Sequence, residues 1–168
     1  EVDVVVVGTG TVAVAAPVAH DAGAEVLVLE KATVFGGTTA ISGGGIWIPN
    51  NYLMQEAGLD DSREKALTYM THVADGQADE DLITTYVDTG NEMLEWLRDN
   101  AGFQWLRPEG PASFADYYTY EGAMDDAITR TVYPVPLNET GGGGGLMACA
   151  RQAIDERRGR VVLVDFWA

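Results

Sequence analysis

Six residues near the start of the chain have the types and spacing of a turn that binds the phosphates of a dinucleotide. Gly8 permits a tight turn, Gly10 lets the backbone approach a pyrophosphate, and Ala13 keeps a following helix close to the preceding strand. The N-terminus of that helix adds unpaired N–H groups and the positive end of a dipole. We therefore expect this turn to contact the phosphates through Gly8, Thr9, Gly10, Thr11, Val12 and Ala13.

An acidic residue follows at the distance that a dinucleotide site requires. Glu30 lies 20 positions after Gly10, at the end of an apolar segment. A carboxylate there can accept hydrogen bonds from ribose hydroxyls. We include its neighbours Lys31 and Ala32 in the expected site. The alternative interpretation of Glu30 is a solvated acid at a strand end.

Three predicted elements position these residues. Residues 2–7 and 25–30 are apolar, β-branched runs that suit parallel strands covered on both faces, and the small residues of 11–22 predict a helix between them. Together they form one βαβ unit with a right-handed crossover. Pro17 falls about two turns into this helix, where we expect it to cost about 3 kcal/mol or to kink the helix.

Two further helices are expected in the middle of the chain. Asp61 and Glu64 match a capping box, and apolar residues at helical spacing follow as far as Val73. Asp79 suits the cap of a second helix whose apolar stripe ends near Leu97. The aromatic and proline-rich residues that follow have weak periodicity and predict an irregular lobe that could contain strands.

The end of the chain is expected to return to the sheet. Five consecutive glycines, residues 141–145, predict a flexible joint, because such a run has much backbone entropy to lose. A helix is expected from about residue 146 to 157, and a third buried strand over 160–167.

The fold class that follows is α/β: a three-layer Rossmann-like domain with a parallel sheet, a helical excursion and an irregular aromatic lobe. The length of 168 residues suits one domain. We expect a single domain over residues 1–168, with the βαβ unit and a Gly-rich loop in 2–50, a helical and aromatic insertion in 51–140, and the returning helix and strand in 146–168.

Charge and composition exclude several functions. The net charge of −16 repels nucleic acid and anionic lipid, so neither is an expected partner. Cys149 is the single cysteine, and His20 and His72 are the two histidines, so we expect no metal site. We see no signal segment and no apolar run long enough to span a membrane, and we expect a cytoplasmic protein without membrane insertion.

The residues after Glu30 distinguish between dinucleotides. The segment Phe35-Gly-Gly-Thr-Thr-Ala-Ile-Ser-Gly-Gly-Gly-Ile-Trp-Ile-Pro49 resembles the flavin domain of the fumarate reductase and 3-ketosteroid dehydrogenase family, and its steroid branch in particular. The resemblance implies FAD, with Glu30 on the adenosine ribose and the loop beneath the pyrophosphate, ribityl chain and isoalloxazine. The loop residues expected to contact FAD are Gly36, Gly37, Thr38, Thr39, Ala40, Ser42, Gly43, Gly44 and Gly45. A flexible Gly/Ser loop without a ligand is the alternative.

Some relatives attach the flavin covalently through a histidine in this loop. This chain has no histidine between His20 and His72, so we expect noncovalent FAD.

The resemblance continues through Ala115-Asp116-Tyr117-Tyr118 and through residues 130–137. In the steroid dehydrogenases a tyrosine of such a segment lines the substrate cavity near the flavin, which makes Tyr118 and Tyr117 the candidate catalytic residues. The implied reaction is hydride transfer from a small-molecule substrate, a 3-ketosteroid, to FAD. Ordinary aromatic packing is the alternative for both tyrosines.

Full-length members of the family are much longer and carry a separate substrate domain. We therefore expect this chain to be a truncated or engineered form that is incomplete for catalysis. Two other functions stay open: an NAD-binding Rossmann domain, and a non-catalytic α/β scaffold.

Overall fold

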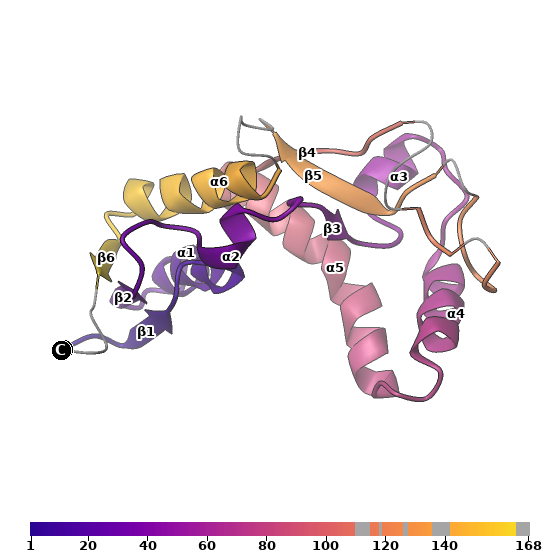
Figure 1. The fold of residues 1–168 in the computed structure, drawn as a ribbon, viewed down its shortest axis with the longest axis horizontal. Helices are drawn as coiled ribbons and strands as arrows, with labels where there is room; N and C mark the ends of the chain where they lie inside the picture. Colours follow the sequence, from indigo (N-terminus) through magenta and orange to yellow (C-terminus); the bar gives the residue numbers. More distant parts are fainter. Residues whose placement is uncertain (110–114, 118, 126–127, 136–141, 164–168) are drawn as a thin grey trace. The chain divides into compact units, whose positions relative to one another are not determined.

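The computed structural model describes residues 1–109, 115–117, 119–125, 128–135 and 142–163 (Figure 1), and the backbone alone of Arg160, Val161 and Leu163. The chain divides into two compact units. The first unit comprises Glu1–Gly44, Ala101–Gln104 and Pro134–Ala168. The second comprises Gly45–Asn100 and Trp105–Tyr133.

The first unit contains the predicted parallel sheet. Its strands are β1 (Val4–Val7), β2 (Val26–Glu30) and β6 (Arg160–Leu163), in the order β1-β2-β6. Both pairs are parallel, with Val6 opposite Val28 and Val28 opposite Val161. The parallel sheet expected from the apolar runs is therefore confirmed, while residues 164–167 of the expected third strand lie outside the described part of the chain.

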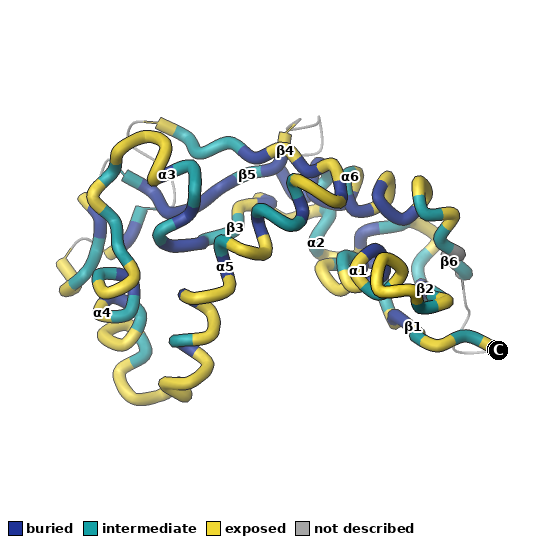
Figure 2. Tube along the Cα trace, turned by 180° about the vertical axis from the view of Figure 1, so that it is seen from behind, coloured by how far each residue is buried: buried dark blue, intermediate teal, exposed yellow. Residues whose placement is uncertain are grey.

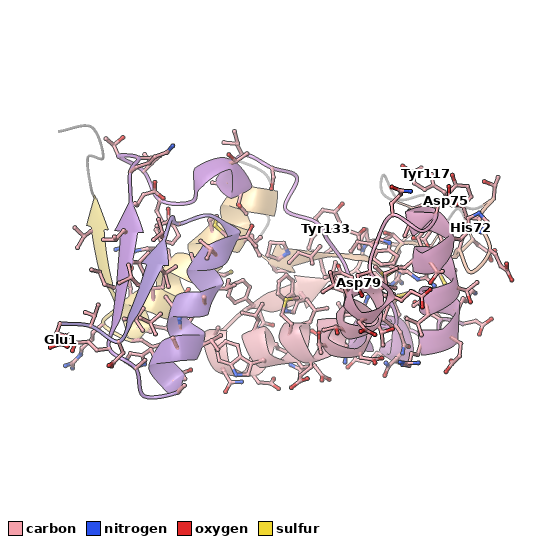
Figure 3. All side chains as sticks on the ribbon, turned by 90° about the horizontal axis from the view of Figure 1, so that it is seen from below. Glu1, His72, Asp75, Asp79, Tyr117 and Tyr133 are labelled. Carbon is pink, nitrogen blue, oxygen red and sulfur yellow. The ribbon has the colours of Figure 1, made fainter. Side chains whose placement is uncertain are left out.

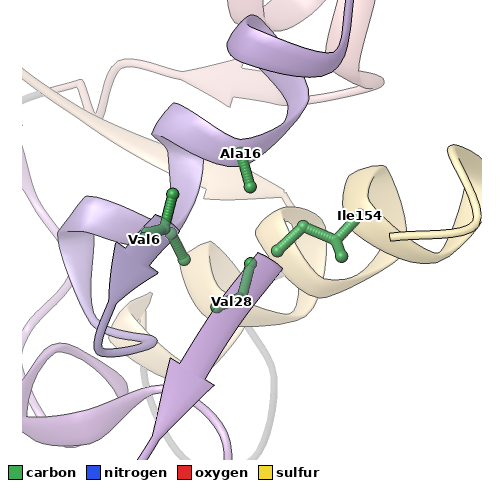
Figure 4. Packing of buried hydrophobic residues seen from close by; sticks show 5 residues of the cluster. Val6, Ala16, Val28 and Ile154 are labelled. Atoms are coloured by element: carbon green, nitrogen blue, oxygen red, sulfur yellow. The ribbon is translucent and has the colours of Figure 1, made fainter. Parts of the chain in front are cut away.

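Two helices cover one face of this sheet. They are α1 (Ala15–Asp21) and α6 (Gly142–Glu156). The core between helices and sheet is built from small and β-branched side chains, and Figure 4 shows four of them: Val6, Ala16, Val28 and Ile154. Val5 and Val7 alternate with Val6 along β1 and are exposed, so β1 is covered on one face, whereas we expected cover on both faces.

Pro17 does not interrupt a helix, contrary to our expectation. The segment after the glycine turn begins as a 3₁₀-helix, η1 (Thr11–Val14), and the α-helix starts only at Ala15. Pro17 is then the third residue of α1, in the first turn, where N–H groups have no partner within the helix. The missing N–H costs nothing there, and the ring is buried.

The second unit contains the two predicted helices and a shorter one. α4 (Arg63–Ala74) and α5 (Glu80–Ala101) follow α3 (Tyr52–Glu56). Asp79 Oδ1 accepts from Asp81 N at 2.8 Å, so the predicted cap at the start of α5 is confirmed. No helix within the described ranges is both long and apolar enough to cross a membrane.

The predicted capping box of α4 is wrong. Ser62 is the N-cap, and its Oγ accepts from Lys65 N at 3.2 Å. The Asp61 carboxylate instead accepts two hydrogen bonds from the guanidinium of Arg130. A charged partner from a distant part of the chain outcompetes the local capping contact.

The aromatic part of the chain contributes to a small second sheet. Its strands are β3 (Ile46–Trp47), β4 (Gln104–Leu106) and β5 (Thr131–Val135), in the order β3-β5-β4. β3 and β5 are antiparallel, with Ile46 opposite Val132. Strands do therefore lie in the lobe that we expected to be irregular.

Candidate functional site

The glycine turn follows β1 directly. Gly8 has a φ of +97°, a conformation that glycine adopts without strain, and its N–H donates to Leu29 O at 2.7 Å. Gly10 then caps η1. Ala13 is fully buried in the core between helix and sheet, which is the close helix–strand contact for which a small residue is needed.

Thr9 joins three segments of the chain beneath this turn. Its side chain is fully buried. The Thr9 hydroxyl donates to Glu30 Oε2 and accepts from Gly36 N at 2.9 Å. The turn, the end of β2 and the loop after β2 are therefore held together by one hydroxyl. The spacing predicts a contact at Thr9 but not this internal role.

Glu30 is a buried anion with a rigid position. Its Oε2 accepts from Thr9 N at 2.8 Å as well as from the Thr9 hydroxyl, and its Oε1 accepts from Ala32 N at 2.7 Å. Two hydrogen bonds chiefly lower the pKa of Glu30: the one from the Thr9 hydroxyl has the larger effect, and the one from Ala32 N has the smaller effect. A carboxylate has roughly four acceptor positions, so these three bonds leave little capacity for a ligand hydroxyl.

The loop after β2 places a hydroxyl oxygen against the glycine turn. Gly37–Ala40 form the single helical turn α2, and Gly36 before it has a φ of +115°. Thr39 Oγ1 accepts from Thr11 N at 3.1 Å, and a Cβ on Gly10 would lie 3.1 Å from the same oxygen. The Thr39 hydroxyl oxygen therefore lies against the backbone of the turn at Gly10 and Thr11.

A cavity of about 440 Å³ opens at the carboxyl ends of β1 and β2. Ligands of open α/β sheets bind at this end of the strands. The cavity is lined by Val7, Gly8, Thr9, Gly10, Leu29, Glu30, Lys31, Gly37, Thr38 and Thr39. All of these except Val7 and Leu29 belong to the predicted site.

The four glycines of the run that the structure describes, Gly142–Gly145, do not form a joint, contrary to our expectation. Gly142–Gly145 form the first turn of α6, and buried positions follow along this helix (Figure 2). Gly143 N donates to Ser42 O at 3.2 Å. A Cβ on Gly143 would lie 2.7 Å from Ser42 O and closer still to Thr39 O. The glycines therefore allow two backbones to touch, and the Gly44 end of the predicted loop packs on the start of α6.

The remaining predicted residues have varied positions. Val12 is exposed, and Ala40 ends α2. Gly43 is exposed, with nothing within 4 Å of an added Cβ. Gly45 belongs to the second unit, where an added Cβ would lie 2.7 Å from Thr131 and 3.0 Å from the ring of Tyr133.

Of the two candidate catalytic tyrosines, Tyr117 is among the described residues. Tyr117 is 67% exposed, and its ring lies 5.6 Å from that of Tyr120. Tyr118 lies outside the described residues. Within the described ranges, no cluster of three or more acidic, histidine or cysteine side chains could hold a metal ion.

The geometry of the first unit fits an anionic dinucleotide at its phosphate and ribose end. A Cβ on Gly10 would make a tight contact with Thr39, the hydroxyls of Thr11 and Thr39 meet at 3.0 Å, and Glu30 borders the same cavity. Backbone N–H groups and hydroxyls suit a phosphate held by dipoles, and Lys31 adds a positive charge to the lining of the cavity.

Comparison with known proteins identifies the same ligand. A family model described as "FAD binding domain" matches residues 3–168. The chain is 43% identical over 140 residues to the 3-oxosteroid 1-dehydrogenase of Comamonas testosteroni, which covers 82% of this chain and 23% of the relative. It is 42% identical over 138 residues to the 4-oxocyclohexanecarboxylate 2-dehydrogenase of Sinomonas cyclohexanicum, covering 81% of this chain and 23% of that relative. It thus spans about a quarter of the length of these relatives.

A solved structure agrees with the sequence comparison. The 3-ketosteroid Δ1-dehydrogenase of Sterolibacterium denitrificans, in complex with 1,4-androstadiene-3,17-dione, superimposes with a TM-score of 0.79 at 27% identity. The alignment covers 96% of this chain and 40% of that structure. The Rossmann-like fold expected from the sequence is confirmed.

Proposed function

This chain belongs to the family of FAD binding domains, and from that premise we propose that it is the flavin-holding part of a dehydrogenase that acts on cyclic ketones. The observation that carries the proposal is the cavity at the carboxyl ends of β1 and β2, eight of whose ten lining residues belong to the predicted dinucleotide site. Bound FAD supplies the group that accepts hydride in such a reaction.

The protein's part begins with the pyrophosphate. The N–H groups of Gly8 and Thr9 donate within the fold, so we assign the backbone N–H of Gly10, with the hydroxyls of Thr38 and Thr39, to the phosphate oxygens. Glycine is favoured at position 10 because a side chain there would crowd Thr39 Oγ1, 3.1 Å from an added Cβ. Gly36, Gly37, Ser42 and Gly43 extend the contact along the loop, and Gly44 and Gly45 complete it.

Glu30 accepts a hydrogen bond from a hydroxyl of the adenosine ribose. It uses the acceptor position that the hydrogen bonds from Thr9 and Ala32 leave free. Its anionic state at neutral pH, maintained by the hydrogen bonds that lower its pKa, makes it a strong acceptor for one hydroxyl. Attachment of FAD is noncovalent, because the loop offers no histidine.

Tyr117 is the described residue that we assign to the substrate. Its exposed phenol can hold or move a proton at Oη, and Tyr118 is the second candidate. The two similar relatives are named for substrates that share a cyclic ketone, a 3-oxosteroid and a 4-oxocyclohexanecarboxylate. Because the identities to the two are nearly equal, the shared cyclic ketone is the substrate class that they support, and a steroid is one member of it.

The absorption spectrum of the purified chain, after incubation with FAD and removal of excess cofactor, tests this proposal. We expect the yellow spectrum of bound oxidised flavin, and complete release of the flavin into the supernatant on acid precipitation. A colourless chain that binds NADH would support the NAD-binding alternative. A chain that binds neither cofactor would support the non-catalytic scaffold. Flavin that stays with the precipitate would contradict noncovalent attachment.

A further inference from the structure

A fully buried arginine organises the second unit. Arg130 has no exposed surface, and its guanidinium lies between two carboxylates whose side chains are 1% and 0% exposed, those of Asp61 and Asp116. Arg130 Nε and Nη2 donate to Asp61 at 2.9 and 2.6 Å, and Nη1 donates to Asp116 Oδ2 at 2.7 Å. A lysine could not make these bonds, because its single ammonium cannot present donors to both carboxylates in fixed directions.

Asp116 links Arg130 to the next residue in the chain, Tyr117. Besides Arg130, Asp116 accepts from Trp47 Nε1 at 2.8 Å and from Met124 N at 3.1 Å. On the other side of the peptide bond, Tyr117 N donates to the hydroxyl of the buried Tyr69 at 3.1 Å. The backbone at residues 116–117 is thereby fixed from both sides.

Packing alone does not hold the ring of Tyr117. The ring is 67% exposed and contacts Tyr120, which in turn stacks on His72 of α4 at 4.7 Å. Tyr117 and His72 are labelled near the same end of α4 in Figure 3. Since these neighbours are exposed residues, the direction of the ring depends on the backbone anchor at Asp116.

The anchor depends on charge. One guanidinium lies between two buried carboxylates, and loss of the guanidinium would leave both buried charges without a partner of opposite sign. Asp116 would then move toward water and take Tyr117 with it. Trp47 and Tyr69 also lie against Arg130, at 5.5 and 5.4 Å from the guanidinium carbon to the ring centroids.

We propose that Arg130, through Asp116, is the positioning residue for Tyr117. The statement rests on the proposed function, in which Tyr117 contacts the substrate. Asp61 and Asp116 both pair with Arg130, but Asp116 alone is bonded to Trp47 and adjacent to Tyr117, so the two acids have separable roles.

The test compares Asp116→Asn with the matched control Asp61→Asn. Both variants remove one buried negative charge next to Arg130 and keep the side-chain size, so both should lower the midpoint of unfolding. The probe is the ring resonances of Tyr117 in the chain labelled with ¹³C-tyrosine, which contains seven tyrosines; Tyr117→Phe assigns the signal. We expect Asp116→Asn to shift the Tyr117 resonances toward those of free tyrosine, and Asp61→Asn to leave them at the parent position.

Two results would overturn the proposal. One is a folded Asp116→Asn variant with Tyr117 resonances at the parent position. The other is an equal shift in Asp61→Asn, which would mean general loosening of the second unit. If Asp116→Asn does not fold, Arg130→Lys takes its place, because it keeps the positive charge but loses the directed hydrogen bonds from the guanidinium to Asp61 and Asp116. A folded Arg130→Lys variant with unmoved Tyr117 resonances would refute the positioning role.

A steroid titration separates this proposal from the proposed function. We expect 1,4-androstadiene-3,17-dione, added to the FAD-loaded parent chain, to perturb the Tyr117 resonances. If the steroid leaves them unchanged while Asp116→Asn still moves them, the positioning of Tyr117 stands and its assignment to the substrate fails.

Discussion

Replacing Gly143 with alanine tests whether the glycine run is a packed helix start or a flexible joint. Gly143 lies in the first turn of α6, and its N–H donates to Ser42 O. In an ordinary helix this substitution would raise the free energy of unfolding by up to about 1 kcal/mol, because alanine has a higher helix propensity than glycine. In a flexible joint it would have little effect.

The contact of Gly143 with the loop makes the substitution destabilising instead of stabilising. A Cβ on Gly143 would lie 2.7 Å from both Ser42 O and Ser42 Oγ, where ordinary contact begins at 3.4 Å, and it would approach Thr39 O more closely. Overpacking of this kind costs about 1–3 kcal/mol. After the gain in propensity, we expect a net loss of about 1–2 kcal/mol, or a fall in Tm of about 3–6 °C for a chain of this size.

Thermal unfolding followed by far-UV circular dichroism measures the difference. The control is Gly43→Ala in the neighbouring loop, where an added Cβ meets nothing within 4 Å and φ is not positive. This control should leave Tm unchanged or raise it slightly, since alanine restricts the unfolded chain. A Gly143→Ala variant as stable as Gly43→Ala would refute the packed helix start.

Two further predictions concern the first unit. Because the folded-state pKa of Glu30 is depressed, its stabilisation is present above the ordinary glutamate value of 4.5 and is lost as pH falls through the folded value. Glu30→Gln should therefore be less stable than the parent in urea at pH 7 by about 1–3 kcal/mol, with a gap that narrows below pH 4.5; a gap that widens in acid would contradict the argument. Pro17→Ala should lower the free energy of unfolding by about 1 kcal/mol through lost buried volume, whereas stabilisation would mean that Pro17 does interrupt the helix.

The βαβ unit could be predicted from the sequence because its signals are local. The apolar runs of the strands, the spacing from Gly8 to Ala13 and the position of Glu30 all lie within 30 residues. Consecutive strands are usually neighbours in a sheet, and the crossover between parallel strands is right-handed with few exceptions. The phosphate end of the candidate site follows from the same local pattern.

Features that depend on distant partners could not be predicted in this way. Asp61 has the sequence of a helix cap, yet it pairs with Arg130, 69 positions along the chain. The glycine run has the composition of a joint, and its packed role depends on backbone from Thr39 to Gly44.

The hydrogen bonds that the Thr9 side chain makes inside the fold also could not be predicted from the neighbouring sequence. Its hydroxyl accepts from Gly36, 27 positions away, and donates to Glu30. A hydroxyl between two glycines suits a phosphate as well as it suits this network, and only the position of Gly36 decides between them. The spacing therefore predicts Thr9 as a site residue but does not predict its hydrogen bonds to Glu30 and Gly36.

The binding of FAD to Gly10→Val tests the central claim most directly. A valine at Gly10 would occupy the space beside Thr39 Oγ1 and keep the pyrophosphate from the turn. The control is Ala22→Val, the same β-branched side chain at the exposed end of α1. With FAD binding followed by quenching of flavin fluorescence, we expect Gly10→Val to raise Kd by about tenfold or more, or about 1.4 kcal/mol, and Ala22→Val to match the parent. A folded Gly10→Val chain that binds FAD as tightly as the parent would show that the pyrophosphate lies elsewhere.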